Sequence, residues 1–396
     1  MRIRKFGQLW RALPLLVCGL LVIMPAPTSA APPAADLAIR FEALLGQHSV
    51  LAADGMRSRI RGDDDFVQAA DAALGRNTAA MSALVRQMFG ARLAGEFGPM
   101  WAEHIVSLFE YASAVAARDE AALDHAREEI EEYELELADF LAAQSRGRLT
   151  RSAARAAVIQ HVEHLTMQAD AYAKQDYATA DRLYRLGYQH SYDLGLALAG
   201  ALLPARDRDT LREPVWRLRS QLGKLLAEHA VLVEDLTRAA AAGTPDFDSS
   251  AQMINGNTRD LVAAVDTLFG AAAAEEFDEV WGARVENLVA YASGNDQARS
   301  ALADCSGELA TFLAGNTGGR ADAAALRSAL AATDGKLLQH ADAYAAKDYP
   351  AAYSLAQESY DQMFDLARDL ADAFGATVAA RLPRGGAQTG YGGMAR

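Results

Sequence analysis

The residues best suited to chemistry in this chain are imidazole and thioether side chains within residues 160–172. His161, His164 and Met167 each follow the one before by three residues. At about 100° per residue, a helix with this spacing places the three side chains on one face, where neighbours three or four residues apart touch. Imidazole together with thioether suits copper, and thioether favours the cuprous ion. The spacing therefore predicts a copper-binding helix face.

Further candidate ligands stand on other predicted helices. His104 follows Trp101 in an apolar run, so its imidazole should face inward, where it needs a partner. Met56 follows His48 by about two helical turns, so these two share one ion only if a third helix lies between them. We predict that four histidines converge on one metal ion and that three more residues supplement the site or line the path into it. The four are His48, His104, His161 and His164, and the three are Met56, Met167 and His190.

The chain holds two copies of one helical unit. Unlike residue types recur in the same order, which is typical of a repeat. The matches include His48 with His229, Asn77 with Asn257, Phe97 with Phe277, Trp101 with Trp281, and Tyr172 with Tyr344. Apolar residues recur at three- and four-residue spacing without β-branched alternation, which indicates helices rather than strands. We predict an all-α fold of two tandem up-and-down bundles, in residues 36–204 and 217–383, with about six helices each.

Helix boundaries in the first copy follow from capping residues. We expect helices to start near Leu37, Phe66, Ala91, Asp119, Thr150 and Asp176. Asp65, Asp119 and Asp176 are short acceptors suited to helix N-termini. Gly62, Gly90 and Gly147 stand where the preceding helices should stop.

The candidate ligands are concentrated in the first copy. Of the eight histidines, the second copy keeps only His229 and His340. The other ligand positions change as follows: His104 to Arg284, His161 to Thr333, His164 to Lys336, Met56 to Thr237, Met167 to Gln339 and His190 to Gln362. Apolar and turn positions survive between the copies while these imidazoles and thioethers do not. A role in folding alone would not obviously concentrate them in one copy.

The first 30 residues are typical of a secretory signal. Four basic residues lie in the first eleven, an apolar run covers residues 13–24, and small residues lead to Ala30. That run is shorter than the ~20 residues of a membrane-spanning helix. We predict cleavage after Ala30 and a soluble protein that is secreted or periplasmic, with no transmembrane segment after cleavage. Apolar residues continue after Cys18, which disfavours lipidation there. Residues 384–396 should form a disordered tail.

The charge of the mature chain restricts its partners. Losing the four basic signal residues changes the formal net charge from −14 to about −18. Such an acidic surface argues against binding nucleic acid or anionic lipid and draws cations nearer. The acidic run 128–136 and His125 are expected on a solvated helix face. Cys305 is the one cysteine that remains, so no internal disulfide can form, and a lone thiol on an alanine-rich helix is more often a small hydrophobe than a nucleophile.

Signatures of catalysis are missing from the sequence, so we predict that the protein is not an enzyme. No Glu-x-x-His pairs, His-Glu-x-x-His, Gly-x-Ser-x-Gly or phosphate-cradling glycine loop occurs. Cys-x-x-Cys-His is also absent, although haem held by His or Met remains an alternative. A histidine in a helical bundle is more often a packing or surface group than a ligand. A second alternative is therefore a non-catalytic interaction module without metal, which binds a protein of the cell envelope.

The repeat pattern resembles a group of exported bacterial all-helical tandem-repeat proteins of unassigned activity. Some of them are associated with domains labelled copper-amine-oxidase-like N-terminal, a name that does not imply oxidase activity. The matching residues are Leu45 to His48, Asn77, Trp101, His104, Ile105, His161, Val162, Asp170, Tyr172, Asp176 and Tyr177. The second copy lacks the Trp-x-x-His and His-Val elements. The resemblance implies the helical architecture and points to His48, His104 and His161, and it leaves the ligand open.

Overall fold

The structure is a computed structural model that describes residues 33–381, and these residues form thirteen α-helices and no strand. The predicted all-α class is confirmed. The helices are α1 (Ala34–Arg61), α2 (Asp64–Phe89), α3 (Ala91–Ala117), α4 (Glu120–Gln144), α5 (Arg151–Ala173), α6 (Tyr177–Leu202), α7 (Ala205–Thr210), α8 (Pro214–Ala242), α9 (Phe247–Phe269), α10 (Ala271–Ala292), α11 (Ala298–Asn316), α12 (Ala323–Ala345) and α13 (Tyr349–Arg381). The predicted signal sequence (1–30) with Cys18 and the predicted tail (384–396) lie outside the described residues.

The capping residues start most helices as predicted. Asp119 and Asp176 accept hydrogen bonds from backbone N–H groups in the first turns of α4 and α6, and Thr150 does the same for α5. The prediction for Asp65 was wrong, because α2 begins at Asp64 and Asp65 lies inside its first turn. A carboxylate there still interacts favourably with the positive end of the helix dipole.

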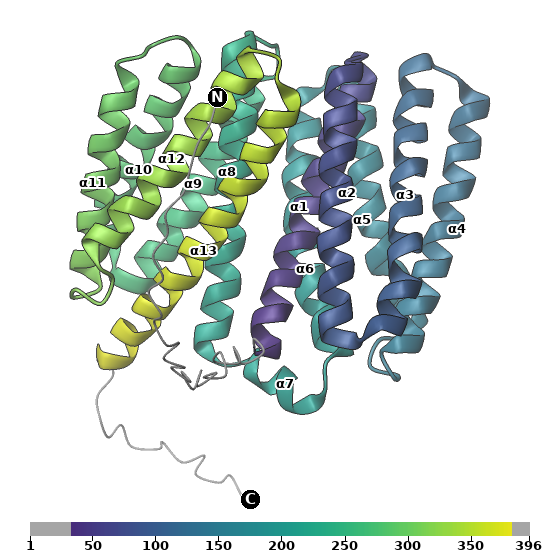
Figure 1. Cartoon of the computed structure of the whole chain (residues 1–396), viewed down its shortest axis with the longest axis horizontal. Coiled ribbons are helices and arrows are strands. Elements are labelled where there is room, and N and C mark those ends of the chain that lie inside the picture. The colour runs from purple at the N-terminus through teal and green to yellow at the C-terminus, as the bar shows by residue number, and fades with distance from the viewer. Residues whose placement is uncertain (1–32, 382–396) are drawn as a thin grey trace, which may run out of the picture. The chain divides into compact units, whose positions relative to one another are not determined.

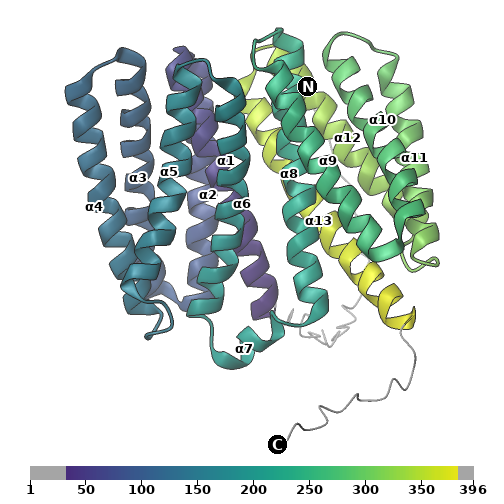
Figure 2. The same cartoon turned by 180° about the vertical axis from the view of Figure 1, so that it is seen from behind.

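Two groups of six helices make up the fold, with α7 between them in the chain. Figures 1 and 2 show α1–α6 side by side on one side and α8–α13 on the other. Within the first group α1 packs against α2, α3, α5 and α6, and within the second α8 packs against α9, α10, α12 and α13. Contacts of α1 with α8, of α6 with α9 and of α2 with α13 join the groups. The described residues, 33–381, accordingly belong to one compact unit.

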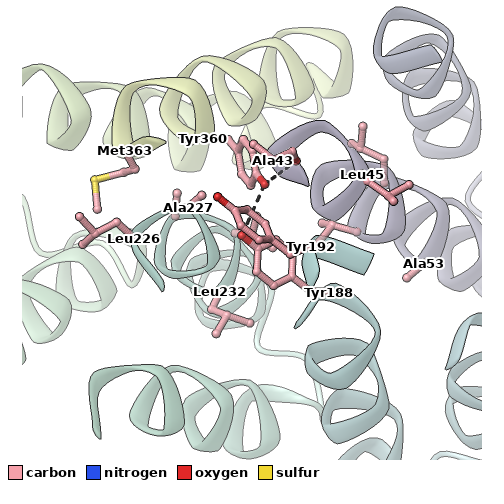
Figure 3. Close-up of a cluster of buried hydrophobic side chains, with 14 of the residues drawn as sticks. Ala43, Leu45, Ala53, Tyr188, Tyr192, Leu226, Ala227, Leu232, Tyr360 and Met363 are labelled. Carbon is pink, nitrogen blue, oxygen red and sulfur yellow. Dashed lines mark hydrogen bonds between the residues drawn. The ribbon is translucent and has the colours of Figure 1, made fainter. Parts of the chain in front are cut away.

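Tyrosines tie the two groups together at their junction. The hydroxyl of Tyr360 on α13 donates to the carbonyl oxygen of Ala43 on α1 at 2.7 Å, and Figure 3 shows this bond in a cluster of buried side chains. The hydroxyl of Tyr188 on α6 donates to the carbonyl oxygen of Lys224 on α8 at 3.0 Å. Each group thus sends one tyrosine to the central helix of the other.

Close packing of α6 on α1 depends on a glycine. A Cβ atom on Gly195 would lie 2.4 Å from Cα of Glu42, a distance that no real Cβ contact tolerates. The missing side chain lets the two backbones approach, and this contact sets the position of α1 in the first group. None of the helices within residues 33–381 combines the length and the apolar character needed to cross a membrane.

Candidate metal centre

Three of the predicted ligands converge inside the first group of helices. His48 on α1, His104 on α3 and His161 on α5 are 0%, 1% and 2% exposed. One ring nitrogen from each lies within 4.8 Å of the other two, and Nε2 of His48 forms a 3.0 Å hydrogen bond with Nε2 of His104. An ion held by three nitrogens at ~2.0 Å separates them by ~3.5 Å. The three rings therefore lie near enough to one another for their nitrogens to meet around one ion after small movements of the side chains.

Aromatic side chains hold these imidazoles in place. The ring centroid of Trp101 lies 4.7 Å from those of His48 and His104. The ring of Tyr133 on α4 stacks on His104 at 4.6 Å with an interplanar angle of 10°. These contacts arise because Phe97, Trp101 and His104 follow one another at three- or four-residue spacing on the inner face of α3. Packed rings of this kind restrict the side chains to one arrangement.

The hydrogen bonds of the cluster leave ligand atoms without partners. Nδ1 of His161 forms a 2.9 Å hydrogen bond with Oγ of Ser191 on α6. When Nδ1 donates to Ser191, the lone pair is on Nε2, which has no hydrogen-bond partner. Such a bond to the far nitrogen is the usual way to orient a metal-binding imidazole.

Burial keeps all three imidazoles uncharged. Burial is the main cause that lowers the pKa of His48 and of His161 well below the ordinary value, and neighbouring histidines lower both further. The pKa of His104 falls to about 3, again because of burial. Near neutral pH the rings are therefore neutral, which is the form that binds metal.

The structure places the other predicted ligands elsewhere. His164 and His190 pair with each other on α5 and α6, with ring centroids 5.4 Å apart, and both side chains are partly exposed. Met56 is fully buried in α1, two turns beyond His48, while Met167 is 52% exposed. Three of the seven predicted residues are thus gathered, and two form a neighbouring pair.

Two residues beside the cluster were missed in the sequence, Tyr133 and Ser191. Tyr133 lies in the acidic run 128–136, which was predicted to be solvated, yet its ring is buried. Glu134 next to it is also buried, and burial raises its pKa to about 7. For these two residues the prediction was wrong, and the apolar spacing of Ile130, Tyr133 and Leu137 was the signal for an inward face. His125 is exposed as predicted.

A different cluster occupies the corresponding place in the second group. His229 on α8 packs against Trp281 on α10 with ring centroids 4.5 Å apart, much as His48 packs against Trp101. There the guanidinium of the fully buried Arg284 lies 2.8 Å from Nε2 of His229 and 2.5 Å from a carboxylate oxygen of Asp334 on α12. The second group thus holds a cation of its own beside its histidine.

Comparisons with protein-family models, with curated proteins and with solved structures found no match for this chain.

Proposed function

We propose that this protein binds and sequesters one metal ion, with copper in the cuprous state preferred, through His48, His104 and His161. The observation that carries the proposal is the convergence of three neutral, buried imidazoles, each of which keeps one ring nitrogen without a hydrogen-bond partner: Nδ1 of His48, Nδ1 of His104 and Nε2 of His161. Buried polar atoms are nearly always paired, so an orphaned nitrogen at the centre of such a cluster requires an explanation. A bound ion would give Nε2 of His161 a partner and would replace the hydrogen bond between Nε2 of His48 and Nε2 of His104.

Charge favours the cuprous ion over zinc. Among the described residues, the group of potential metal ligands at this site contains three histidines and no carboxylate. A divalent ion would bring two positive charges into the core without compensation, whereas a cuprous ion brings one, and burying charge is costly. Three imidazoles also satisfy a cuprous ion, while zinc normally takes a fourth ligand.

Burial favours storage or sequestration over catalysis. A catalytic metal keeps an open position for water or substrate. The three imidazoles here are almost fully covered, and Trp101 and Tyr133 close around them. Together with the predicted export signal, this supports a non-catalytic role for the bound metal outside the cytoplasm.

The partly exposed His164 and His190 supply a path to the site. His190 is the chain neighbour of Ser191, which bonds to His161. His164 lies one turn beyond His161 on α5, and its Nδ1 has no hydrogen-bond partner. An ion held first between His164 and His190 would be one helical turn from the buried cluster.

We further propose that the fold is a pair of tandem bundles in which only the first binds metal. In the second, the guanidinium of Arg284 fills the polar space beside His229 with a permanent cation, and Asp334 balances its charge. An internal cation where the first bundle has His104 makes a metal ion unnecessary there. The second bundle then acts as a scaffold.

The geometry does not favour the haem alternative. The cavity beside Trp101 has a volume of about 20 Å³, whereas pockets for cofactors and drug-sized ligands measure ~300–1,000 Å³. Packed rings fill the remaining space around the histidines. An envelope-protein partner remains the alternative if no metal binds.

The test is an anaerobic titration of the mature, tag-free chain with cuprous ions against a competing chelator, and a parallel titration with zinc. We expect one tightly held cuprous ion per chain and weaker zinc binding. The variant His161→Ala should lose the tight site, while His125→Ala, which changes an exposed histidine, should keep it. Absence of binding, or equal binding by both variants, would leave the cluster as core packing.

A further inference from the structure

A second candidate site lies away from the histidine cluster, in a cavity between the two groups of helices. Its volume is about 60 Å³, and its walls come from α1, α2, α6, α8, α12 and α13. A water molecule needs ~10–15 Å³ measured in this way, so the cavity has room for roughly four heavy atoms. The helices that line the cavity lie far apart in the sequence and meet at the junction between the two groups, which Figure 1 shows.

Two corresponding pairs of aspartate and arginine, one from each group of helices, line the cavity. The two pairs have different partners. Asp54 and Arg57 on α1 recur as Asp235 and Arg238 on α8. Arg238 binds Asp235 at 2.8 Å, and Ser250 donates to the same carboxylate at 2.6 Å. In the second pair the arginine therefore binds the aspartate of its own pair, and Arg238 also binds Asp246 at 2.6 Å.

In the first pair the two residues do not bind each other. Arg57 binds Asp181 at 2.8 Å and Gln168 at 2.8 Å and makes no ion pair with Asp54. The carboxyl group of Asp54 consequently makes no ion pair within 4 Å and no side-chain hydrogen bond with any residue in the range 33–381, although it lines the cavity and the charges of Arg57, Arg238 and Arg61 act on it from further away. Burial raises its pKa to about 6, so it is ionised above neutral pH.

Two more polar groups of the lining lack partners. Nδ1 of His340 on α12 and the hydroxyl of Tyr353 on α13 are buried and make no hydrogen bond. Their side chains are only 8% and 5% exposed. Burial lowers the pKa of His340 to about 4, so its ring is neutral and can accept a hydrogen bond. The remaining walls include apolar side chains such as Val50, Leu51 and Val231.

We propose that this cavity binds a small primary alkylammonium ion, with its charged end on the carboxylate of Asp54, further N–H groups directed to His340 and Tyr353, and its alkyl end against the apolar wall. An ammonium group supplies three donors and one positive charge, which matches an unpaired carboxylate with two nearby acceptors. Arg57 and Arg238 are already paired with carboxylates, and Arg61, the third guanidinium of the lining, donates to Tyr172 and Ser58, so these groups offer little to an anion.

This site is independent of the metal centre and is tested on the mature, full-length, metal-free chain. Isothermal titration with propylammonium chloride should give saturable binding in the millimolar range. Propan-1-ol, which is uncharged, and sodium acetate, which is an anion, have the same number of heavy atoms and should bind at least about tenfold more weakly, the loss expected when a charged hydrogen bond is removed.

The variant Asp54→Asn should weaken propylammonium binding by about tenfold or more. Glu234→Gln is the matched control, because Glu234 lines the same cavity but already has a partner in Ser359 and has its pKa raised to about 8. It should bind propylammonium as the parent chain does. If Asp54→Asn does not fold, Tyr353→Phe should still bind more weakly than the parent. Equal binding of all three probes, tighter binding of acetate, or undiminished binding by Asp54→Asn would overturn the proposal.

Discussion

The guanidinium of Arg284 lies 2.8 Å from Nε2 of His229. Arg284 stands at the sequence position that His104 occupies in the first group. Asp334, which balances this charge, stands where the first group has Val162. In both groups a histidine packs against a tryptophan in a similar way. The two groups differ at a few positions around that contact. This comparison can be tested by exchanging the residues.

The triple variant Arg284→His/Thr333→His/Asp334→Val gives the second group the ligand residues of the first. We expect it to bind two cuprous ions per chain where the parent binds one, because three imidazoles would then face one another on α8, α10 and α12. Titration against a chelator measures the stoichiometry. The single variant Thr333→His, which keeps Arg284, is the control and should still bind one ion. If the folded triple variant also bound only one, Arg284 would not be a substitute for metal.

Access to the buried site should depend on His164. Replacing it with alanine should slow the uptake of cuprous ion, because the partly exposed pair with His190 is lost, and should leave the final stoichiometry at one per chain. Stopped-flow loading measures the rate, and His125→Ala serves as the surface control. Unchanged loading kinetics would remove the pair from the path, and a lost stoichiometry would make His164 a ligand instead.

Stability should respond to pH through Glu234. Burial raises its pKa from 4.5 to about 8, so the folded state binds more protons than the unfolded state between these values. Its contribution to the free energy of unfolding therefore falls as pH rises from about 4.5 to about 8, by at most about 1.4 kcal/mol per pH unit. Glu234→Gln lacks this dependence and should gain stability relative to the parent across that window. Urea unfolding at several pH values measures it, with the exposed Glu128→Gln as control. Parallel profiles for parent and Glu234→Gln would contradict the pKa assignment.

The contact between α1 and α6 should not tolerate a side chain at Gly195. Gly195→Ala places a Cβ against the backbone of Glu42 and should destabilise the fold by about 1–3 kcal/mol. Gly75→Ala, in the exposed middle of α2 with nothing within 4 Å, should instead be neutral or stabilise by up to about 1 kcal/mol. Chemical unfolding of both variants gives the comparison. Equal effects would mean that α6 can move away from α1.

Local signals in the sequence predict most of the helical framework. Asp119, Thr150 and Asp176 mark helix starts because a short acceptor satisfies free N–H groups wherever it precedes a helix. His104 could be assigned to the core because Trp101 and Leu108 share its helix face. Such patterns depend only on residues within a turn or two of each other.

Which histidines meet could be predicted only in part. The three-residue spacing of His161, His164 and Met167 suggested one ladder of ligands, but the helix turns His164 toward His190 and leaves Met167 exposed. That outcome depends on how α5 rotates against α1, α3 and α6, which local spacing does not determine. The cavity at Asp54 could not be predicted from local spacing at all, because it depends on Arg57 binding Asp181 and not Asp54.

The most direct test of the metal centre is a crystal of the copper-loaded mature chain, measured on both sides of the copper absorption edge. The account predicts one anomalous peak per chain, between the rings of His48, His104 and His161, and no peak beside His229 and Arg284. A peak at another place, or none between these three rings in a crystal that contains copper, would contradict it.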